Sequence, residues 1–526
     1  MRKYLSPGVY IKHLFQRTRP IEPVRTGTAG FLGSTERGPT DPRLLTSYAD
    51  FERLYGGRVD GSHLQPAVRG FFINGGERCY VGRVTATAAT ASGALSTGDE
   101  PSSGTDEEDS VDEPTENEGD AGLLVRASEP GVWGERVAVV VADASSRRRN
   151  DQLFSMIVRY WADESTYGGA AAPSVNTLPA PDIQETYDDL SADSSSNRFY
   201  ADVVNGASSL VELDAEAAVR PENTDGEPLW LAGPFGSGSP VTVDHYLGEE
   251  PTEIEGLSGF KAFERIGEIS IICVPDEHDI TGLTDTVLQH CHEMGDRFAI
   301  LQAERSPGPI SDIDPPNDDS MAAFYYPWLS VGNPDTGVTE MVPPGGHVAG
   351  VYARTDEEYG VHKAPANQVV HGVDGLQRTV TNAEQAVLNP RGVNCIRDFR
   401  HRGIRVWGAR TASSEPEWRY VNVRRLVLFL KESIQEGIEW ARSKSNDEQL
   451  WERIVRAIRN FLSDVWKGGA FMGETPEEAF FVMCDRNTMT QSDIDNGRLV
   501  CEIGVAPMRP AEFVVFRITQ WMDESE

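Results

Sequence analysis

The sequence predicts a protein of several domains that combines α/β and α+β architecture: a core with a mixed sheet flanked by helices, a β-rich inserted domain, and a C-terminal α+β domain. Three observations predict this. Apolar, glycine-punctuated strands occur in two separate parts of the chain, a long acidic and strand-rich stretch lies between them, and two amphipathic helices stand close to the end. At 526 residues the chain is also too long for one ordinary core.

The first part of the core is expected over residues 21–95, after an N-terminal arm at residues 1–20. Two prolines separate the arm from residues 28–33, an apolar strand punctuated by glycine. Alternation of apolar and polar side chains resumes at residues 78–84. Both segments are expected to be buried strands of an α/β core.

An inserted, β-rich outer domain is expected over residues 96–252. Residues 98–120 hold eleven acidic side chains, no basic ones and almost no apolar ones. Such a composition buries too little apolar surface to offset the entropy lost on folding, so this stretch is expected to be a solvated loop. Strand-like segments follow at residues 123–127, 137–141 and 153–160.

The core is expected to resume over residues 253–405. Residues 269–275 form a buried strand, a helix follows, and residues 297–301 form a second buried strand. Two strands joined by a crossover helix in one sheet run in the same direction, so these two are expected to pair in parallel.

A C-terminal domain is expected over residues 406–510, built on two amphipathic helices. Asn422 can cap the first helix, Ser445 and Glu448 form a capping-box pattern before the second, and Gly468 ends it. Both helices carry apolar side chains at spacings of three and four, which predicts a core-facing stripe. These side chains are Leu426, Leu430, Ile434, Ile438 and Ala441 in the first helix and Leu450, Ile454, Ile458, Phe461 and Val465 in the second.

Strand patterns without a nearby partner stand at both ends of the chain. Residues 4–12 combine a short turn with an apolar strand, and nothing close in sequence can pair with it. Within the last segment, residues 511–526, the run at 512–519 is too apolar to remain an unpaired strand. Both ends are therefore expected to need a sheet to join.

The charge balance argues against nucleic acid as a partner. Asp and Glu number 82 against 48 Lys and Arg, only seven of which are Lys, and the formal net charge is −34. Subunits with this charge repel one another unless salt shortens the Debye length to ~3 Å. We therefore hypothesise a salt-loving host.

Membrane insertion and export are not expected either. No apolar run approaches the ~18 residues that span a bilayer, and residues 1–8 lack the apolar core of a signal peptide. The six cysteines stand singly with no Cys-x-x-Cys, so neither a disulfide framework nor a zinc site is indicated.

The strongest catalytic alternative is a subtilisin-like protease. Residues 345–350, with His347, resemble the histidine motif of that class, and residues 335–337, with Asp335, resemble its aspartate motif. The two motifs stand only twelve residues apart, and no nucleophile segment with an activated serine follows. We therefore expect residues 345–350 to be a strand of the core and the protein not to be an enzyme.

Three further motifs are expected to have structural roles. His290 and His292 flank Cys291 in a predicted helix, where residues two apart face different directions, so an exposed His and a buried Cys are expected rather than a metal site. Residues 236–239 lack the Lys-Ser/Thr of a phosphate loop, and residues 147–149 are three arginines among acids. A surface turn and a charge-balanced loop are expected there, and no cofactor or metal.

Several short motifs occur in a definite order along the chain. They are YLSPGVY at 4–10, GTAGFLGSTERGP at 27–39, FFINGGERCYVGRV at 71–84, EPGVWG at 129–134, VAGVYARTD at 348–356, GVHKAPAN at 360–367, YVNVRR at 420–425, CDRNTMT at 484–490 and DNGRL at 495–499. In this order they resemble the contractile tail sheath family of phage tails and extracellular injection particles. The stretches 96–120 and 161–250 depart from the family pattern in length and acidity.

The resemblance implies a structural subunit that polymerises helically around an inner tube and contracts to drive the tube through a target envelope. The partners it implies are other copies of the chain, an inner tube protein, and baseplate and terminator proteins. Assembly is expected in the cytoplasm, before the subunit acts in a virion tail or a released particle. A non-contractile self-assembling shell is the alternative.

The resemblance also implies which segments join subunits. The N-terminal arm and the C-terminal strand would be donated into neighbouring subunits, while linkers such as residues 20–24 absorb dihedral changes during contraction. In sheaths a helix of the C-terminal domain faces the inner tube, which makes the polar side of residues 447–467 a candidate tube contact. The residues concerned are Gly8, Val9, Tyr10, Ile11, Phe513, Val514, Val515, Phe516, Arg517 and Ile518 for strand exchange, and Glu448, Glu452, Arg453, Arg456 and Arg459 for the tube.

Overall fold

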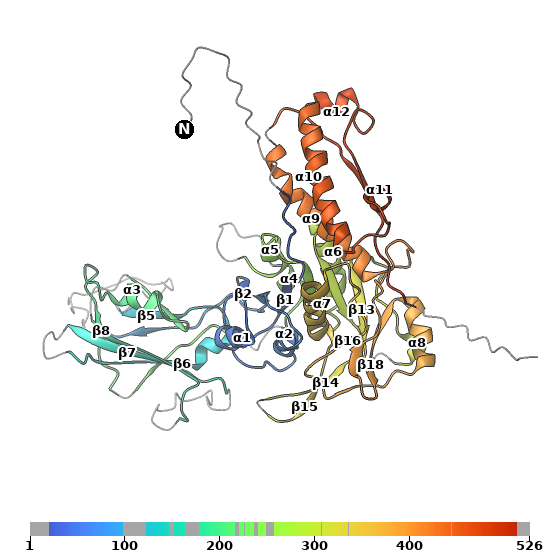
Figure 1. The fold of residues 1–526 in the computed structure, drawn as a ribbon. Helices are drawn as coiled ribbons and strands as arrows, with labels where there is room; N and C mark the ends of the chain where they lie inside the picture. The colour runs from blue at the N-terminus through green and yellow to red at the C-terminus, as the bar shows by residue number, and fades with distance from the viewer. Residues whose placement is uncertain are drawn as a thin grey trace, which may run out of the picture.

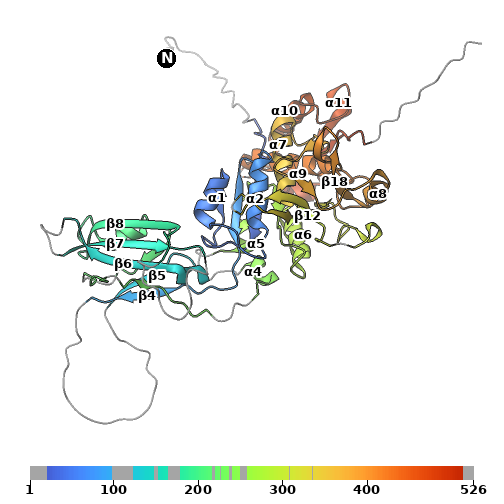
Figure 2. The ribbon, with the colours of Figure 1, turned by 90° about the horizontal axis from the view of Figure 1, so that it is seen from below.

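The computed structural model describes residues 20–97, 122–146, 152–163, 178–215, 220–225, 227–235, 240–248, 257–306, 308–334, 336–442 and 444–512. These residues form a central domain, an outer β-rich domain to one side of it, and a C-terminal domain whose two long helices rise above it (Figure 1). The predicted combination of α/β and α+β domains is confirmed. Figure 2 shows the outer domain standing apart from the central helices in a second view.

A nine-stranded mixed sheet forms the central domain, in the order β16-β19-β18-β13-β12-β11-β1-β3-β2. The strands from β18 to β3 are parallel, and antiparallel strands close both edges. The predicted parallel pairing is confirmed for β11 and β12. The strands are Ala29–Gly33 (β1), Arg43–Leu45 (β2), Cys79–Arg83 (β3), Ile271–Cys273 (β11), Phe298–Gln302 (β12), Ala322–Tyr326 (β13), Gln368–Val369 (β16), Val393–Phe399 (β18) and Gly403–Val406 (β19).

Helices cover both faces of this sheet. Residues three apart in a strand point to opposite faces, and a Cβ at Gly30 would meet Phe263 of α5 at 2.8 Å, whereas one at Gly33 would meet Leu64 of α2 at 3.1 Å. The helices of this domain are Tyr48–Tyr55 (α1), Leu64–Ile73 (α2), Val243–Leu247 (α4), Gly259–Phe263 (α5), Leu283–Met294 (α6), Gly345–Tyr359 (α7) and Asn382–Leu388 (α8). A small sheet of Leu329–Gly332 (β14), Thr339–Val342 (β15) and Gly375–Leu376 (β17) lies beside them.

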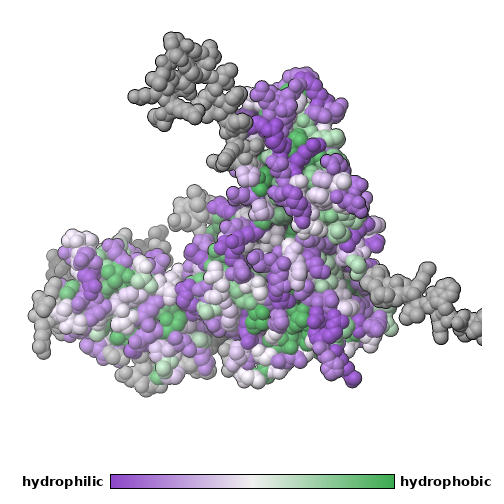
Figure 3. All heavy atoms as spheres, in the orientation of Figure 1, coloured by the Kyte–Doolittle hydropathy of each residue, from purple (hydrophilic) through white to green (hydrophobic). Residues whose placement is uncertain are grey.

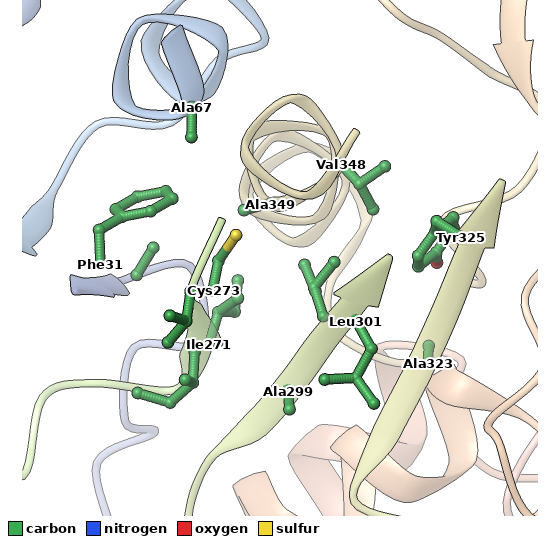
Figure 4. Close-up of a cluster of buried hydrophobic side chains, with 14 of the residues drawn as sticks. Phe31, Ala67, Ile271, Cys273, Ala299, Leu301, Ala323, Tyr325, Val348 and Ala349 are labelled. Carbon is green, nitrogen blue, oxygen red and sulfur yellow. The ribbon is translucent and has the colours of Figure 1, made fainter. Parts of the chain in front are cut away.

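The expectation of a strand at residues 345–350 is wrong, because these residues begin helix α7. Glycines four residues apart let α7 approach α2 closely: a Cβ at Gly346 would lie 2.2 Å from the carbonyl oxygen of Ala67, and one at Gly350 would lie 2.4 Å from that of Phe71. A short apolar run with glycine does not by itself distinguish a buried helix from a strand. Figure 4 shows this helix lying over the buried strands of the sheet.

Adding one methyl group at this helix contact is expected to destabilise the fold. In Gly346→Ala, the new Cβ has only backbone to displace, so the free energy of unfolding should fall by about 2 kcal/mol in a denaturant titration. Gly267→Ala is the matched control, since a Cβ there would have no heavy atom within 4 Å. Equal stability of the two variants would contradict the close packing of α2 and α7.

The outer domain contains two antiparallel sheets around its own apolar core. Its strands are Ser92–Leu95 (β4), Leu123–Ala127 (β5), Val137–Asp143 (β6), Leu153–Tyr160 (β7), Ile183–Ser191 (β8), Val211–Leu213 (β9) and Leu229–Trp230 (β10), with helix Tyr200–Asn205 (α3). The three predicted strands are confirmed as β5, β6 and β7. Strand β4 pairs with β5 although it precedes residue 96, and Tyr246 packs in the central core although it precedes residue 253. Both boundaries of the outer domain therefore lie closer to the N-terminus than those of the predicted 96–252.

The C-terminal domain consists of two long helices and a hairpin around a third apolar cluster. Its elements are Val421–Gly437 (α9), Glu448–Lys467 (α10), Pro476–Ala479 (α11), Phe480–Met483 (β20), Gln491–Asp495 (α12) and Glu502–Val505 (β21). Both predicted helices are confirmed, and Leu450, Ile454 and Ile458 are buried as the stripe predicted.

Both predicted helix caps are wrong. Tyr420 precedes α9, and Asn422 lies inside the helix, where its side-chain amide donates to the carbonyl oxygens of His362 and Met508 at 2.8 and 3.0 Å. Asp447 caps α10 and accepts from the backbone N–H of Leu450 at 2.9 Å. Asn422 does not cap α9 because its side chain binds residues far away in the sequence. Ser445 does not cap α10 because Asp447, an equally good capping residue two positions later, does so instead.

The segment before β1 is fastened along α9. Ile21 is buried in the C-terminal apolar cluster, the backbone N–H of Val24 donates to Ser433 Oγ at 3.1 Å, and the carbonyl oxygen of Thr26 accepts from Arg425 Nη2 at 2.8 Å. Residues 20–24, which the resemblance implies absorb dihedral changes during contraction, are thus held at Ile21 and Val24 in this structure, and their movement during contraction stays a prediction. An apolar side chain and a serine hydroxyl on α9 give this stretch partners that the local sequence does not indicate.

The visible surface is mostly hydrophilic. Figure 3 shows hydrophobic residues in small separate patches among predominantly polar ones. In the described part of the chain, every helix is too short or too polar to traverse a lipid bilayer.

Candidate functional site: the assembly surface of the C-terminal domain

The hairpin of β20 and β21 is a sheet of only two strands within the described residues. Its register pairs Phe480 with Val505 and Met483 with Glu502. Apolar side chains on it face solvent, with Phe481 50%, Met483 41% and Ile503 37% exposed. An isolated two-stranded sheet is marginal in water, and its outer edges present unpaired backbone groups that can accept another strand.

An apolar groove of about 780 Å³ runs along this hairpin. One wall comes from α9, one from α10 and one from β21, so the groove lies beside a strand edge. Its apolar lining includes Leu430, Ile434, Ile438, Ile454, Ile458, Leu499, Ile503 and Val505. Such a groove fits an apolar strand better than a charged one.

Helix α10 presents a charged face to a second hollow, of about 690 Å³. Glu448, Glu452, Arg456 and Arg459 line it together with the chain after β20. Arg486 Nε lies 3.1 Å from Glu448 Oε1 across this hollow. Four of the five residues expected to contact the tube therefore share one side of the helix.

Arg453, the fifth, lies outside this set. Its guanidinium carbon lies 4.6 Å from the ring centroid of Trp440, which follows α9. On an α-helix, residue 453 is turned by about 100° from residue 452, so it faces α9 rather than the hollow.

Arg425 joins α9, α7 and the segment before β1. It donates to both carboxylate oxygens of Asp356, at 3.0 and 2.7 Å, and also to Thr26, while its guanidinium lies over the ring of Tyr352. The side chains of Arg425 and Asp356 are 4% and 5% exposed. Burial raises the pKa of Asp356, and the opposing charge of Arg425 limits that rise.

The C-terminal segment is held to its own subunit as far as Glu512. The carboxylate of Glu512 accepts from Arg410 Nε and Nη2 at 2.8 and 2.7 Å and from Asn389 Nδ2 at 2.6 Å. These donors lower the pKa of Glu512 against the effect of its burial. The residues expected to cross between subunits, Gly8 to Ile11 and Phe513 to Ile518, lie outside the described residues, so strand exchange stays a prediction.

His347 is not placed as a catalytic base would be. It lies on α7 with 1% exposure, packed against α2, where a Cβ at Gly70 would meet its Nδ1 at 2.3 Å. Burial lowers the pKa of His347 to about 4, so the ring is neutral near pH 7. Asp335 lies outside the described residues.

The histidines around Cys291 have separate environments. His292 is the expected exposed histidine, and its Nε2 lies 2.7 Å from Asp319 Oδ2, whereas Cys291 is fully buried. His290 is buried too, with its Nε2 3.1 Å from Nη1 of the buried Arg297. The tetrapeptide at 236–239 and the arginines at 147–149 lie outside the described residues.

Sequence reasoning missed one group of potential metal ligands at the carboxyl end of β11. His63, Asp276 and Asp279 offer ligand atoms within 4.8 Å of one another. Asp276 Oδ1 already accepts from the backbone N–H of His63 at 2.8 Å, and its Oδ2 accepts from Ser62 Oγ at 3.2 Å. This carboxylate therefore holds the start of α2, a contact between positions more than 200 residues apart that no local pattern could have indicated.

Two family models match this chain. The family model for the phage tail sheath protein central domain matches residues 254–412, and the model for the phage tail sheath C-terminal domain matches residues 413–520. Together they cover about half of the chain. The chain belongs to the phage tail sheath family.

Curated relatives agree with this tail sheath assignment. The chain is 27% identical over 237 residues to a putative prophage major tail sheath protein of Pseudomonas aeruginosa, covering 41% of this chain and 59% of that one. It is 26% identical over 174 residues to the tail sheath protein of Escherichia phage P2, covering 32% and 42%. The chain thus matches less than two thirds of the length of these relatives.

Solved structures share the fold of this tail sheath protein. The sheath of an extracellular contractile injection system, PVC, in the contracted state has a TM-score of 0.56 and 21% identity, with 100% of both chains covered. The contracted helical sheath of the anti-feeding prophage has a TM-score of 0.55 and 22% identity, covering 98% of this chain and 100% of that one. A sheath tail protein of Listeria innocua has a TM-score of 0.58 and 12% identity, covering 93% and 96%.

Proposed function

We propose that this protein is the structural sheath subunit of a contractile injection machine. It polymerises helically around an inner tube and shortens to drive that tube through a target envelope. The observation that carries the proposal is the two-stranded hairpin with exposed apolar side chains beside an apolar groove, a surface suited to joining copies of a tail sheath protein. The role is structural rather than catalytic.

The hairpin is the acceptor for the donated strands in this proposal. Residues 8–11 and 513–518 of neighbouring copies add to the edges of β20 and β21, and their apolar side chains cover the groove and the exposed face. Main-chain hydrogen bonds then join subunits while apolar pockets fix the register. Two features support the proposal. The hairpin has only two strands among the described residues, and the sequence at both ends of the chain has the pattern of a strand.

Contraction follows from how the subunits are joined. Strand addition tethers neighbours while each folded body moves as a unit, so the lattice stays connected as its pitch changes. The extended array is metastable, and relaxation into a better-packed array supplies the stroke. Assembly takes place in the cytoplasm, with baseplate and terminator proteins at the two ends, and the particle then acts as a virion tail or after release.

Electron microscopy of purified protein separates this function from that of a non-contractile shell. A contractile sheath is expected to form tubes of two lengths and diameters, extended on its inner tube and contracted after release. Tubes of one form under all conditions would favour the shell.

Because the net charge is −34, assembly should require high salt, and equal assembly at low salt would remove the reason to infer a salt-loving host.

The charged side of α10 is proposed to contact the inner tube. Reversing Arg456 and Arg459 to Glu removes the two cations that α10 contributes to the hollow, and we expect co-assembly of sheath and tube, measured by pelleting, to fall at least about tenfold. Arg453→Glu is the matched control, since it changes the same charge on the same helix away from that hollow. Equal loss in the two variants would assign the effect to helix stability instead of the tube.

A further inference from the structure

Two cysteines stand side by side in the proposed acceptor hairpin. The register of β20 and β21 ends at the pair Met483 and Glu502, and the next position of the same register places Cys484 opposite Cys501. The described part of the chain holds four other cysteines, Cys79, Cys273, Cys291 and Cys395, and all four are buried in the central domain. Only the hairpin brings two thiols to facing positions on neighbouring strands of the described structure.

The hydrogen bonding of the hairpin fixes which kind of pair this is. Ala506 donates its N–H to the carbonyl oxygen of Ala479 at 2.9 Å, so the position of these two residues is hydrogen-bonded. Hydrogen-bonded and non-hydrogen-bonded positions alternate along an antiparallel ladder, which makes the position of Cys484 and Cys501 non-hydrogen-bonded. Facing Cα atoms lie about 4.5 Å apart at such positions, within the ~4.4–6.8 Å range of disulfides.

The two thiols already interact. The Cys501 thiol donates a hydrogen bond to the Cys484 sulfur, which lowers the pKa of Cys484 and raises that of Cys501. Cys484 is 7% exposed and lines the hollow beside α10, while the half-buried Cys501 lines the groove beside α9. A small oxidant therefore has a route to the pair from either side of the hairpin.

We propose that Cys484 and Cys501 form an oxidation site, at which peroxide closes an intramolecular disulfide at the end of the hairpin where the connecting loop begins. The Cys484 thiolate attacks one oxygen of hydrogen peroxide, so an S–O bond forms, the O–O bond breaks and hydroxide leaves. The Cys501 sulfur then attacks the Cys484 sulfur, so the S–S bond forms, the S–O bond breaks and water leaves with the Cys501 proton. The two thiols are oxidised, and one peroxide is reduced to two waters.

The cross-link would join the two strands one position beyond their last recorded pair, Met483 and Glu502. Between the two cysteines lies the loop that contains α12, and its two ends are joined by a hydrogen bond from Thr488 Oγ1 to the carbonyl oxygen of Val500 at 2.9 Å. A disulfide there limits the freedom of the unfolded loop and so resists opening of the hairpin. The chemistry does not depend on the sheath function, although its benefit to a particle outside the cell does.

Mass spectrometry of the purified full chain tests the cross-link. After treatment with hydrogen peroxide, quenching, denaturation and alkylation with iodoacetamide, we expect a disulfide-linked peptide containing residues 484 and 501 that disappears on reduction. The four cysteines of the central domain should be fully alkylated in the same sample. The oxidised chain should also unfold several degrees higher than the reduced one, a shift that Cys484→Ser and Cys501→Ser both abolish.

Other products would overturn the proposal. Alkylation of both hairpin cysteines after peroxide, a stable sulfinic acid on either, or a cross-link between two chains would each show that the pair does not close. If the serine variants fail to fold, the mass of the oxidised wild-type peptide still decides the question. Because this readout needs no assembly, its failure is distinguishable from failure of the proposed sheath function.

Discussion

A chain that ends at Glu512 is expected to remain a folded monomer and to lose polymerisation. Truncation after this residue removes Phe513 to Ile518, the strand expected to enter a neighbour, but keeps the contacts of Glu512 with Arg410 and Asn389. Deleting residues 1–15 should have the same effect, because it leaves the buried Ile21 in place. Subunits without a donated strand lose the main-chain bonds across the boundary, so tube formation should fall below detection.

Size-exclusion chromatography and negative-stain electron microscopy measure this result. The matched control is Phe481→Ser, which keeps both chain ends but removes an apolar side chain from the acceptor hairpin, where it is 50% exposed. This variant should fold normally but assemble poorly. Tubes of normal appearance from either truncation would contradict strand donation, and circular dichroism of the truncated chains would show whether the monomers are folded.

Loss of the buried cation at Arg425 is expected to be the most destabilising single change. Arg425→Met leaves the carboxylate of Asp356 buried without its partner and removes the bond to Thr26. Breaking a buried ion pair in this way costs about 3–5 kcal/mol. We expect the free energy of unfolding, measured by denaturant titration near pH 7, to fall by that amount.

The pH dependence of the Arg425→Met deficit identifies its cause. Removing Arg425 takes away the largest effect that opposes burial, so the pKa of Asp356 in the folded state rises further. A raised folded-state pKa of an acid destabilises the fold above that pKa, and the penalty disappears as the pH falls to the ordinary pKa of Asp. The deficit should therefore shrink on acidification, and Arg425→Met with Asp356→Leu should recover most of the loss. A deficit that does not change with pH would point to lost packing instead.

Local patterns predicted the elements whose partners are close in sequence. Strand-like runs of residues were enough for β6 and β7, and the spacing of Leu450, Ile454 and Ile458 was enough for α10. These predictions succeed because the apolar residues of one element recur at the period of that element, so the buried face can be identified from the local sequence.

The remaining features depend on partners far away in the chain. Helix α7 looked like a strand because Gly346 and Gly350 are explained by the close approach of α2, some 280 residues earlier. Asn422 looked like a cap because its partners, His362 and Met508, are not local. Of the candidate site, the charged face of α10 could be predicted from helical spacing, whereas the groove beside β21 could not, because three separate elements form it.

The attachment of residues 21–26 to α9 decides where mechanical tension enters the subunit. In the proposed lattice, a neighbour that pulls on the N-terminal arm would load Ile21 first, then Val24, then Thr26, and would reach β1 only after all three contacts had broken. The helical domain would then take up the strain of a stroke, and the broad sheet at the centre of each subunit would be shielded from it.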